Sequence, residues 1–229
     1  MLIIVDRKLP ERVKSNLRHY GDLLELVSDG ITYPAISGHP DIFFALCGQR
    51  LIIAPNLPAK YIRFLEKKSV DFVTGDKPVG EVYPHTASYN AVITGKYLIH
   101  NLKLTDEEIL KQALRRRRID VAQGYCRCNL IPLKDDRFIT SDRGIKRILD
   151  DHDLICLYVD PRGITLPGFK HGFIGGTAGI MQDKFFFTGS LSSFPFGKTL
   201  RVFLSDLGYE IVELNDGPPI DGGSIMFVA

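Results

Sequence analysis

Two cysteines that flank an arginine form the short segment of this 229-residue chain with the clearest chemical potential. In an extended segment, Cys126 and Cys128 would face one side and Arg127 the other, because side chains alternate along a strand. A thiol beside a cation ionises more readily and becomes nucleophilic, so either cysteine is a candidate catalytic residue, with His171 as the proton carrier. The alternative is that both thiols pack as small apolar side chains.

The other candidate residues lie in five loops that contain glycine or proline and that each precede a short apolar segment. Three of the six histidines and two of the four cysteines fall in these loops. Because loops held on a rigid scaffold concentrate function, we expect a ligand site where they meet. The expected ligand-binding residues are His39, Asp41, His85, Arg127, Asn129, Gly175, Gly176 and Asp221.

Cysteine and histidine spacing does not predict a metal centre. Cys126 and Cys128 could supply two ligands, but no second Cys/His pair follows at ligand spacing. Cys47 and Cys156 lie within apolar strands and are expected to be inert. We therefore expect neither a metal nor another cofactor. A metal-assisted enzyme that uses His39, His85, His171 and Cys126 stays as an alternative.

The elements that must position these loops recur five times as a strand–strand–helix–strand unit. The second strands open at a basic residue, as at Arg50, Lys96, Arg137 and Lys184, and a tight turn joins each to the strand before it. Such turns make antiparallel hairpins, which an open parallel α/β sheet lacks. The predicted first strands are 42–47, 89–94, 128–133 and 177–182. Predicted helices include 105–117, with Thr105 and Glu108 at capping-box spacing, 142–150 and 197–207.

The two ends of the chain supply the halves of one unit. Residues 1–6 read as a second strand with no first strand before it, and residues 224–229 as a first strand with no second strand after it. Pairing the two would complete the fifth unit and close a ring without exposed sheet edges. The predicted fold is α/β, a five-bladed β/α propeller in one domain over residues 1–229.

This pattern resembles the pentein fold of the guanidine-modifying superfamily, which includes deiminases, dimethylarginine dimethylaminohydrolases and amidinotransferases. The pattern covers the whole chain. Residues 221–228, Asp-Gly-Gly-Ser-Ile-Met-Phe-Val, are similar to the glycine-rich strand that carries the nucleophile in that family. The third and fourth units are similar more weakly.

The resemblance implies a cysteine that attacks the guanidinium carbon, a histidine that transfers protons and acidic groups that hold the guanidinium. It places the nucleophile at Met226, which has no thiol, and the histidine near His171. It places two carboxylates within residues 126–129, where the sequence has none. The resemblance therefore implies a divergent pentein rather than a standard guanidine-modifying enzyme.

Net charge and hydropathy limit the partners and the cellular location that we expect for this chain. The formal net charge of +2 gives little reason to expect nucleic-acid binding. There is no apolar run of about 20 residues and no signal-peptide pattern, so we expect a cytoplasmic protein without a membrane span. The expected function is a small-molecule site, for an amino acid or amine-like ligand, on the pseudo-fivefold axis. The alternative to an enzyme or small-molecule site is a catalytically silent pentein that binds a macromolecular partner.

Overall fold

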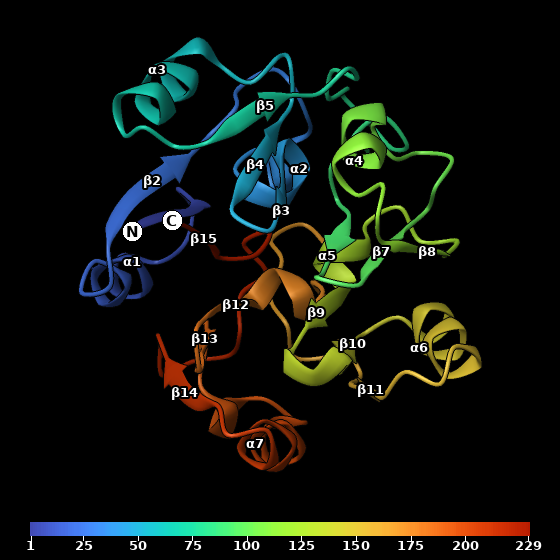
Figure 1. Ribbon diagram of the computed structural model, residues 1–229. Helices are drawn as coiled ribbons and strands as arrows, with labels where there is room; N and C mark the ends of the chain where they lie inside the picture. Colours follow the sequence, from blue (N-terminus) through green and yellow to red (C-terminus); the bar gives the residue numbers. More distant parts are fainter.

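The structure, a computed structural model, describes residues 1–229 as five small three-stranded sheets arranged around a common centre (Figure 1). The predicted five units are confirmed in this form. Within each sheet the strands are given in their hydrogen-bonded order. The sheets are β15 (Met226–Val228), β1 (Leu2–Asp6), β2 (Asp22–Leu26); β3 (Phe44–Cys47), β4 (Arg50–Ile53), β5 (Phe72–Thr74); β6 (Val92–Ile93), β7 (Tyr97–His100), β8 (Arg117–Asp120); β9 (Leu130–Pro132), β10 (Phe138–Thr140), β11 (Cys156–Tyr158); and β12 (Ala178–Met181), β13 (Lys184–Phe187), β14 (Glu210–Glu213).

Every sheet has the same pairing pattern. The first strand pairs antiparallel with the second, and the second pairs parallel with the third. No hydrogen-bonded ladder joins one sheet to the next, so the structure contains no closed sheet. The hairpin turns within each unit therefore set the local architecture, as the sequence predicts.

The two ends of the chain share one sheet. β1 pairs antiparallel with β15, with Leu2 opposite Val228 and Ile4 opposite Met226. β1 also pairs in parallel with β2, so it is the central strand of its sheet. The pairing predicted from the two unmatched end segments is confirmed.

Five helices connect the second and third strands and lie on the outside of the molecule (Figure 1). They are α1 (Glu11–Leu17), α3 (Ala59–Lys67), α4 (Glu107–Gln112), α6 (Arg143–Asp151) and α7 (Gly197–Asp206). Parallel strands require such a crossover, and an amphipathic helix covers the sheet with its apolar face. In α6, for example, Ile145 and Leu149 are buried and the Asp142 carboxylate accepts the Ile145 N–H at 2.9 Å. No helix in the structure has the length and apolar character needed to cross a membrane.

The helix predicted over 105–117 is shorter than expected. α4 ends at Gln112, and the arginine-rich segment that follows enters β8. Its N-cap is Asp106, whose carboxylate accepts the Glu108 N–H at 2.9 Å. The predicted capping box is wrong because the Thr105 hydroxyl is instead 2.8 Å from Nδ1 of buried His100.

Short helical turns stand directly before three of the first strands. α2 (Pro40–Phe43) precedes β3, α5 (Cys126–Asn129) precedes β9, and the 3-10 turn η3 (Ile174–Thr177) precedes β12. The strands consequently begin one or two residues later than predicted. The other 3-10 turns are η1 (Pro34–Ile36), η2 (Lys134–Asp136) and η4 (Leu191–Ser193). In Figure 1, α2 and α5 lie near the centre and the crossover helices do not.

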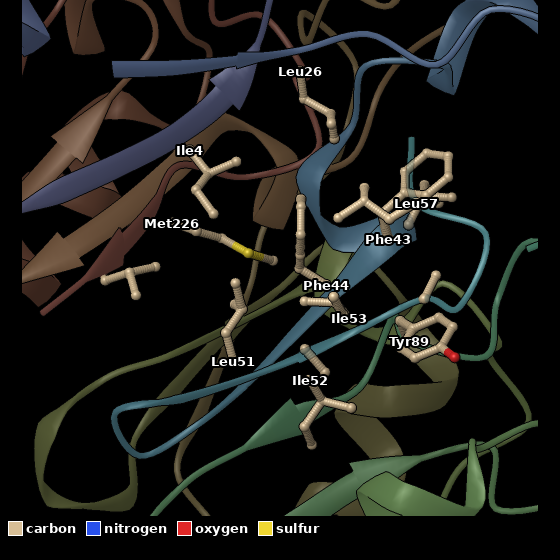
Figure 2. Close-up of a cluster of buried hydrophobic side chains, with 14 of the residues drawn as sticks. Ile4, Leu26, Phe43, Phe44, Leu51, Ile52, Ile53, Leu57, Tyr89 and Met226 are labelled. Carbon is tan, nitrogen blue, oxygen red and sulfur yellow. The ribbon is translucent and has the colours of Figure 1, made fainter. Parts of the chain in front are cut away.

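The largest apolar cluster lies mainly between two neighbouring sheets, β15–β1–β2 and β3–β4–β5, and extends to Leu98 of β7 and Ile109 of α4. Ile4 and Met226 of one sheet pack with Phe44 and Leu51 of the next, as Figure 2 shows. Burial of each such side chain contributes about 1.5–3 kcal/mol. The cluster holds β15 against the rest of the protein, so the last strand is part of the core.

Candidate functional site

A group of buried polar side chains, the central cluster, lies where the turns before the first strands converge. Its members are His39, Asp41, Asn90, Cys128 and Asp221, each at most 4% exposed. His39 precedes α2, which contains Asp41. Asn90 lies shortly before β6, Cys128 lies in α5 and Asp221 precedes β15. Four of the five units therefore contribute to one site.

Asn90 orders one half of the central cluster. Its amide Nδ2 donates to the Asp41 carbonyl at 3.0 Å and to Cys128 Sγ at 3.2 Å, and its Oδ1 accepts the Cys128 N–H at 3.0 Å. The Cys128 thiol in turn donates to Asp41 Oδ2 at 3.0 Å. The thiol and the carboxylate are thus held side by side.

His39 occupies the other half, between two carboxylates. Its Nε2 lies 3.8 Å from Asp6 Oδ2, and its Nδ1 lies 3.9 Å from Asp221 Oδ1. Burial lowers the pKa of His39 to about 3, so the ring is neutral at pH 7 and these contacts are not ion pairs. A neutral imidazole keeps a lone pair for a proton or a metal ion.

Three carboxylates of this region are buried without a lysine or arginine within ion-pair distance. Burial is the main cause that raises the pKa of Asp6 and of Asp41 to about 6, and that of Asp221 to about 7. Asp221 accepts the N–H groups of Phe173 at 2.8 Å and Gly223 at 3.0 Å, which oppose the rise. No lysine or arginine neutralises these carboxylates, so a cation bound in this region would stabilise their ionised form.

Two adjoining cavities open onto the central cluster. The acidic cavity, with a volume of about 280 Å³, is lined by Asp6, Lys8, Leu9, Pro34, Ala35, His39, Leu166, Pro167, Ile220, Asp221 and Gly222. The aromatic cavity, of about 120 Å³, is lined by Tyr33, Ile36, His39, Ile42, Tyr125, Cys128, Leu166, Phe169, His171, Phe173 and Asp221. His39, Leu166 and Asp221 belong to both linings, so these residues form the boundary between the two cavities.

A third cavity, of about 160 Å³, is lined largely by residues of the first strands. Met226 and Arg127 line it, together with apolar side chains. Arg127 donates to the Gly175 carbonyl at 3.0 Å. The position to which the resemblance assigns the nucleophile therefore faces a different cavity from His39 and Asp221.

The structure separates the two cysteines of the Cys-Arg-Cys segment. The prediction of an extended segment is wrong, because residues 126–129 form α5, and residues two apart on a helix point roughly 200° apart. Cys126 belongs to an apolar cluster with Leu130 and Phe138, whereas Cys128 lines the aromatic cavity. Burial raises the pKa of both thiols, which favours the un-ionised form.

The remaining predicted residues, His171, His85 and Asn129, occupy three different environments. His171 lines the aromatic cavity, where its Nδ1 is 3.0 Å from the Gly172 carbonyl. His85 is exposed and lines none of the three cavities. Asn129 supports the fold, since its Nδ2 donates to the Tyr125 carbonyl and its Oδ1 accepts from Ser141, both at 3.0 Å.

Gly175 and Gly176 allow neighbouring segments to approach closely. A Cβ atom on Gly175 would collide with the Arg127 carbonyl, and one on Gly176 would collide with the Asp221 carboxylate. These glycines allow Arg127 and Asp221 to approach closely, and their carbonyls accept hydrogen bonds, from Arg127 at Gly175 and from the Ser224 N–H at Gly176.

Sequence reasoning missed Asp6, Asn90, Tyr33 and Tyr125. Asp6 closes the apolar run 2–5, and a carboxylate at the end of a buried strand is a usable signal for a site. Asn90 lies within a segment predicted as a strand, where one short polar side chain among apolar neighbours is the corresponding signal. The two tyrosines carry no pattern that distinguishes them from core residues.

Solved structures of similar fold include enzymes that act on guanidine compounds. DDAH from Pseudomonas aeruginosa in complex with citrulline has a TM-score of 0.57 at 10% identity, covering 94% of this chain and 91% of that one. SxtG, an amidinotransferase from Microseira wollei, has a TM-score of 0.55 at 11% identity, covering 94% and 88%. The N-terminal domain of ArgZ, an arginine dihydrolase from cyanobacteria, has a TM-score of 0.55 at 11% identity, covering 91% and 77%.

These likenesses confirm the pentein-like fold that the sequence pattern suggests, and at this identity they concern the fold alone. The curated proteins contain no match to the chain. The model of a family described as a family of unknown function, DUF6873, matches residues 4–226. Since that match spans nearly the whole chain, the protein belongs to the DUF6873 family.

Proposed function

We propose that this protein binds a small zwitterionic metabolite of the amino-acid class in the acidic and aromatic cavities, and that it is not a standard guanidine-modifying enzyme. The observation that carries the proposal is the lining of the acidic cavity. Two carboxylates, Asp6 and Asp221, share it with the ammonium-bearing Lys8. A ligand with one positive and one negative group fits this charge pattern.

The carboxylates supply the site for the positive group. Asp6, Asp41 and Asp221 are buried near one another, and the mutual repulsion of Asp41 and Asp221 adds to the desolvation that raises the pKa of Asp221. An ammonium group in the acidic cavity would favour the ionised carboxylates and offset their burial. An amine is therefore the expected cationic group of the ligand.

Lys8 supplies a counterpart for a carboxylate. Its Nζ donates to the Ser37 hydroxyl at 2.9 Å and to the Pro34 carbonyl, which hold the side chain at the edge of the cavity. The aromatic cavity adjoins this space and offers Tyr33, Phe169 and Phe173 to the rest of the ligand. An apolar or aromatic amino-acid side chain matches that lining.

Guanidine chemistry is not proposed, because no activated thiol is placed for it. Met226 has no ionisable group and faces the third cavity. Cys128 does line the aromatic cavity, but its raised pKa and its hydrogen bond to Asp41 keep it protonated at neutral pH.

The finer architecture is also a proposal. We propose that the five sheets act as the blades of a closed propeller around an axis through the central cluster. The β1–β15 pairing and the convergence of four units on one cluster support this description.

Calorimetry with matched ligands tests the binding proposal. A thermal-shift screen of the common amino acids identifies the best ligand, which is then compared with its deaminated and decarboxylated analogues. Loss of either charged group should weaken binding at least about 30-fold, since removing one partner of a buried charge pair costs about 2 kcal/mol or more. If no amino acid binds, or if both analogues bind as well as the parent, the proposal is wrong.

Variants then locate the binding. Asp221→Asn and Lys8→Met should each weaken binding, and Asp216→Asn is the matched control because Asp216 lies in the same loop with an exposed side chain. Asp221 accepts two backbone N–H groups, so the melting temperature of each variant is measured alongside. Equal binding by Asp221→Asn and Asp216→Asn would exclude the acidic cavity.

A further inference from the structure

Three ligand-type side chains of the central cluster converge on one point. A ring nitrogen of His39, a carboxylate oxygen of Asp41 and the thiol of Cys128 all lie within 4.8 Å of one another. All three side chains are buried. The set combines one nitrogen, one oxygen and one sulfur ligand, a combination that suits zinc and similar divalent transition metals.

Two polar atoms of this set have no hydrogen-bond partner within the protein. They are Nδ1 of His39 and Oδ1 of Asp41, and the hydroxyl of the nearby Ser224 is a third buried atom in this condition. A buried polar atom without a partner costs about 1–3 kcal/mol, so such atoms are uncommon unless they serve a ligand. Here they belong to residues that already point toward one another.

We propose that His39, Asp41 and Cys128 form a binding site for a divalent transition-metal ion, of which zinc is the best match. In a tetrahedral zinc site, the ligand atoms lie roughly 3.3–3.5 Å apart. The Cys128 thiol is 3.0 Å from Asp41 Oδ2, and the widest separation in the set is below 4.8 Å. Small side-chain rotations therefore suffice to reach coordination distances.

The surroundings supply the support that metal ligands usually have. Asn90 hydrogen-bonds both the Cys128 sulfur and the Asp41 backbone, so it fixes two ligands relative to each other. His39 has a carboxylate near each ring nitrogen, Asp6 on one side and Asp221 on the other. A carboxylate next to the free nitrogen of a metal-bound histidine orients the ring and raises its basicity.

Charge balance also favours a cation at this point. On metal binding, the covalent S–H bond of Cys128 breaks and its proton leaves to solvent. A metal–sulfur bond forms in its place, and the thiol hydrogen bond to Asp41 is lost. The ion then compensates the new thiolate and the Asp41 carboxylate. Three protein ligands leave one position open, and the aromatic cavity, which His39 and Cys128 line, gives access to it.

The test uses the full chain after treatment with a chelator, and it requires no organic ligand, so its outcome is independent of the proposed amino-acid site. Titration with Zn²⁺ should show one tight site per chain. Cys128→Ser should weaken that site at least about 100-fold, since even the loss of a residue that only hydrogen-bonds a metal ligand costs about 10–100-fold in affinity. Cys126→Ser should leave it unchanged, because Cys126 lies on the same turn but packs in an apolar cluster.

Cobalt substitution gives a second readout. Co²⁺ should produce a thiolate-to-cobalt charge-transfer band in the unaltered protein and in Cys126→Ser, and not in Cys128→Ser. Less than one zinc per chain, or the same affinity in the two cysteine variants, would overturn the proposal. If Cys128→Ser does not fold, the cobalt spectra of the other two proteins still test the proposal. The absence of the charge-transfer band from the unaltered protein, or its loss in Cys126→Ser, would also overturn it.

Discussion

Removal of residues 224–229 should unfold the protein or bring it close to unfolding. This segment contains β15, and Ile225, Met226 and Val228 are each at most 6% exposed. At about 1.5–3 kcal/mol for each buried side chain, their loss costs about 5–9 kcal/mol. Domains are typically stable by only about 5–15 kcal/mol, so the truncation removes much of the margin.

The segment also connects two sheets. On one side β15 pairs with β1, and on the other the Ile225 N–H donates to the Ala178 carbonyl at 3.1 Å while the Ser224 N–H donates to Gly176 at 3.1 Å. Truncation therefore exposes an edge of β1 and removes the link to the sheet that begins with β12. The lost backbone contacts add to the lost burial.

Thermal unfolding followed by circular dichroism, with urea unfolding as a check, measures the effect. A loss of about 5 kcal/mol lowers the melting temperature of a chain of this size by roughly 10–20 °C. Removal of the exposed Ala229 alone is the control and should change it little. A truncated chain that melts within about 2 °C of the full chain would refute both the burial estimate and the role of β15 in completing the fifth unit.

Two further predictions concern polar residues outside the proposed metal-binding set, the partly buried Arg127 and the buried His100. Replacement of Arg127 by methionine removes the charged hydrogen bond to Gly175 and the positive charge that lowers the pKa of Asp41, so we expect a loss of roughly 2–4 kcal/mol in urea unfolding. An unchanged midpoint would contradict this. His100 is buried between Thr105 and Gly124, and burial lowers its pKa to about 4, below the unfolded value of 6.5. Between pH 4 and pH 6.5 the unfolded chain binds the His100 proton more readily than the folded protein does. The stability that the neutral, buried His100 contributes is therefore complete above pH 6.5 and is lost as the pH falls toward 4, by up to about 3 kcal/mol. The stability difference between the unaltered protein and His100→Asn should shrink over that range, and a constant difference would argue against the lowered pKa.

The repeated unit was predictable because each of its parts leaves a local signal. Apolar runs of four to six residues, a basic residue after a tight turn and an amphipathic stretch recur in a fixed order. The pairing of the chain ends followed from the same order, since the leftover segments complement each other. Hydrophobic patterning thus determines most of the architecture.

The turns before the first strands were not predictable in the same way. A four-residue helix such as α5 is too short to show a helical period, and the Cys126–Asn129 segment also fits the alternation of a strand. Contacts between units decide its conformation, as in the hydrogen bonds of Asn90 to Cys128. The error mattered because it reversed the expected direction of Cys126.

The central cluster was only partly predictable because its residues come from different units. His39 and Asp41 belong to one unit, and Asn90, Cys128 and Asp221 belong to three others, so no single stretch of the sequence contains the cluster. The sequence points to the loops that converge in the structure, since it places His39, Asp41, Cys128 and Asp221 in them. It did not indicate that Asn90 and Asp6 complete the arrangement.

The same geometry explains why a pentein-like fold need not carry guanidine chemistry. The five units bring their turns to one region whatever residues those turns contain, so the architecture constrains where a site lies and leaves its chemistry to a few positions. Here Met226 occupies the position that resembles the family nucleophile, and it packs in the core between two sheets. The polar groups gather instead around His39, which borders both the acidic and the aromatic cavity. The identity of the side chains at that point, rather than the arrangement of the sheets, decides which chemistry the site can support.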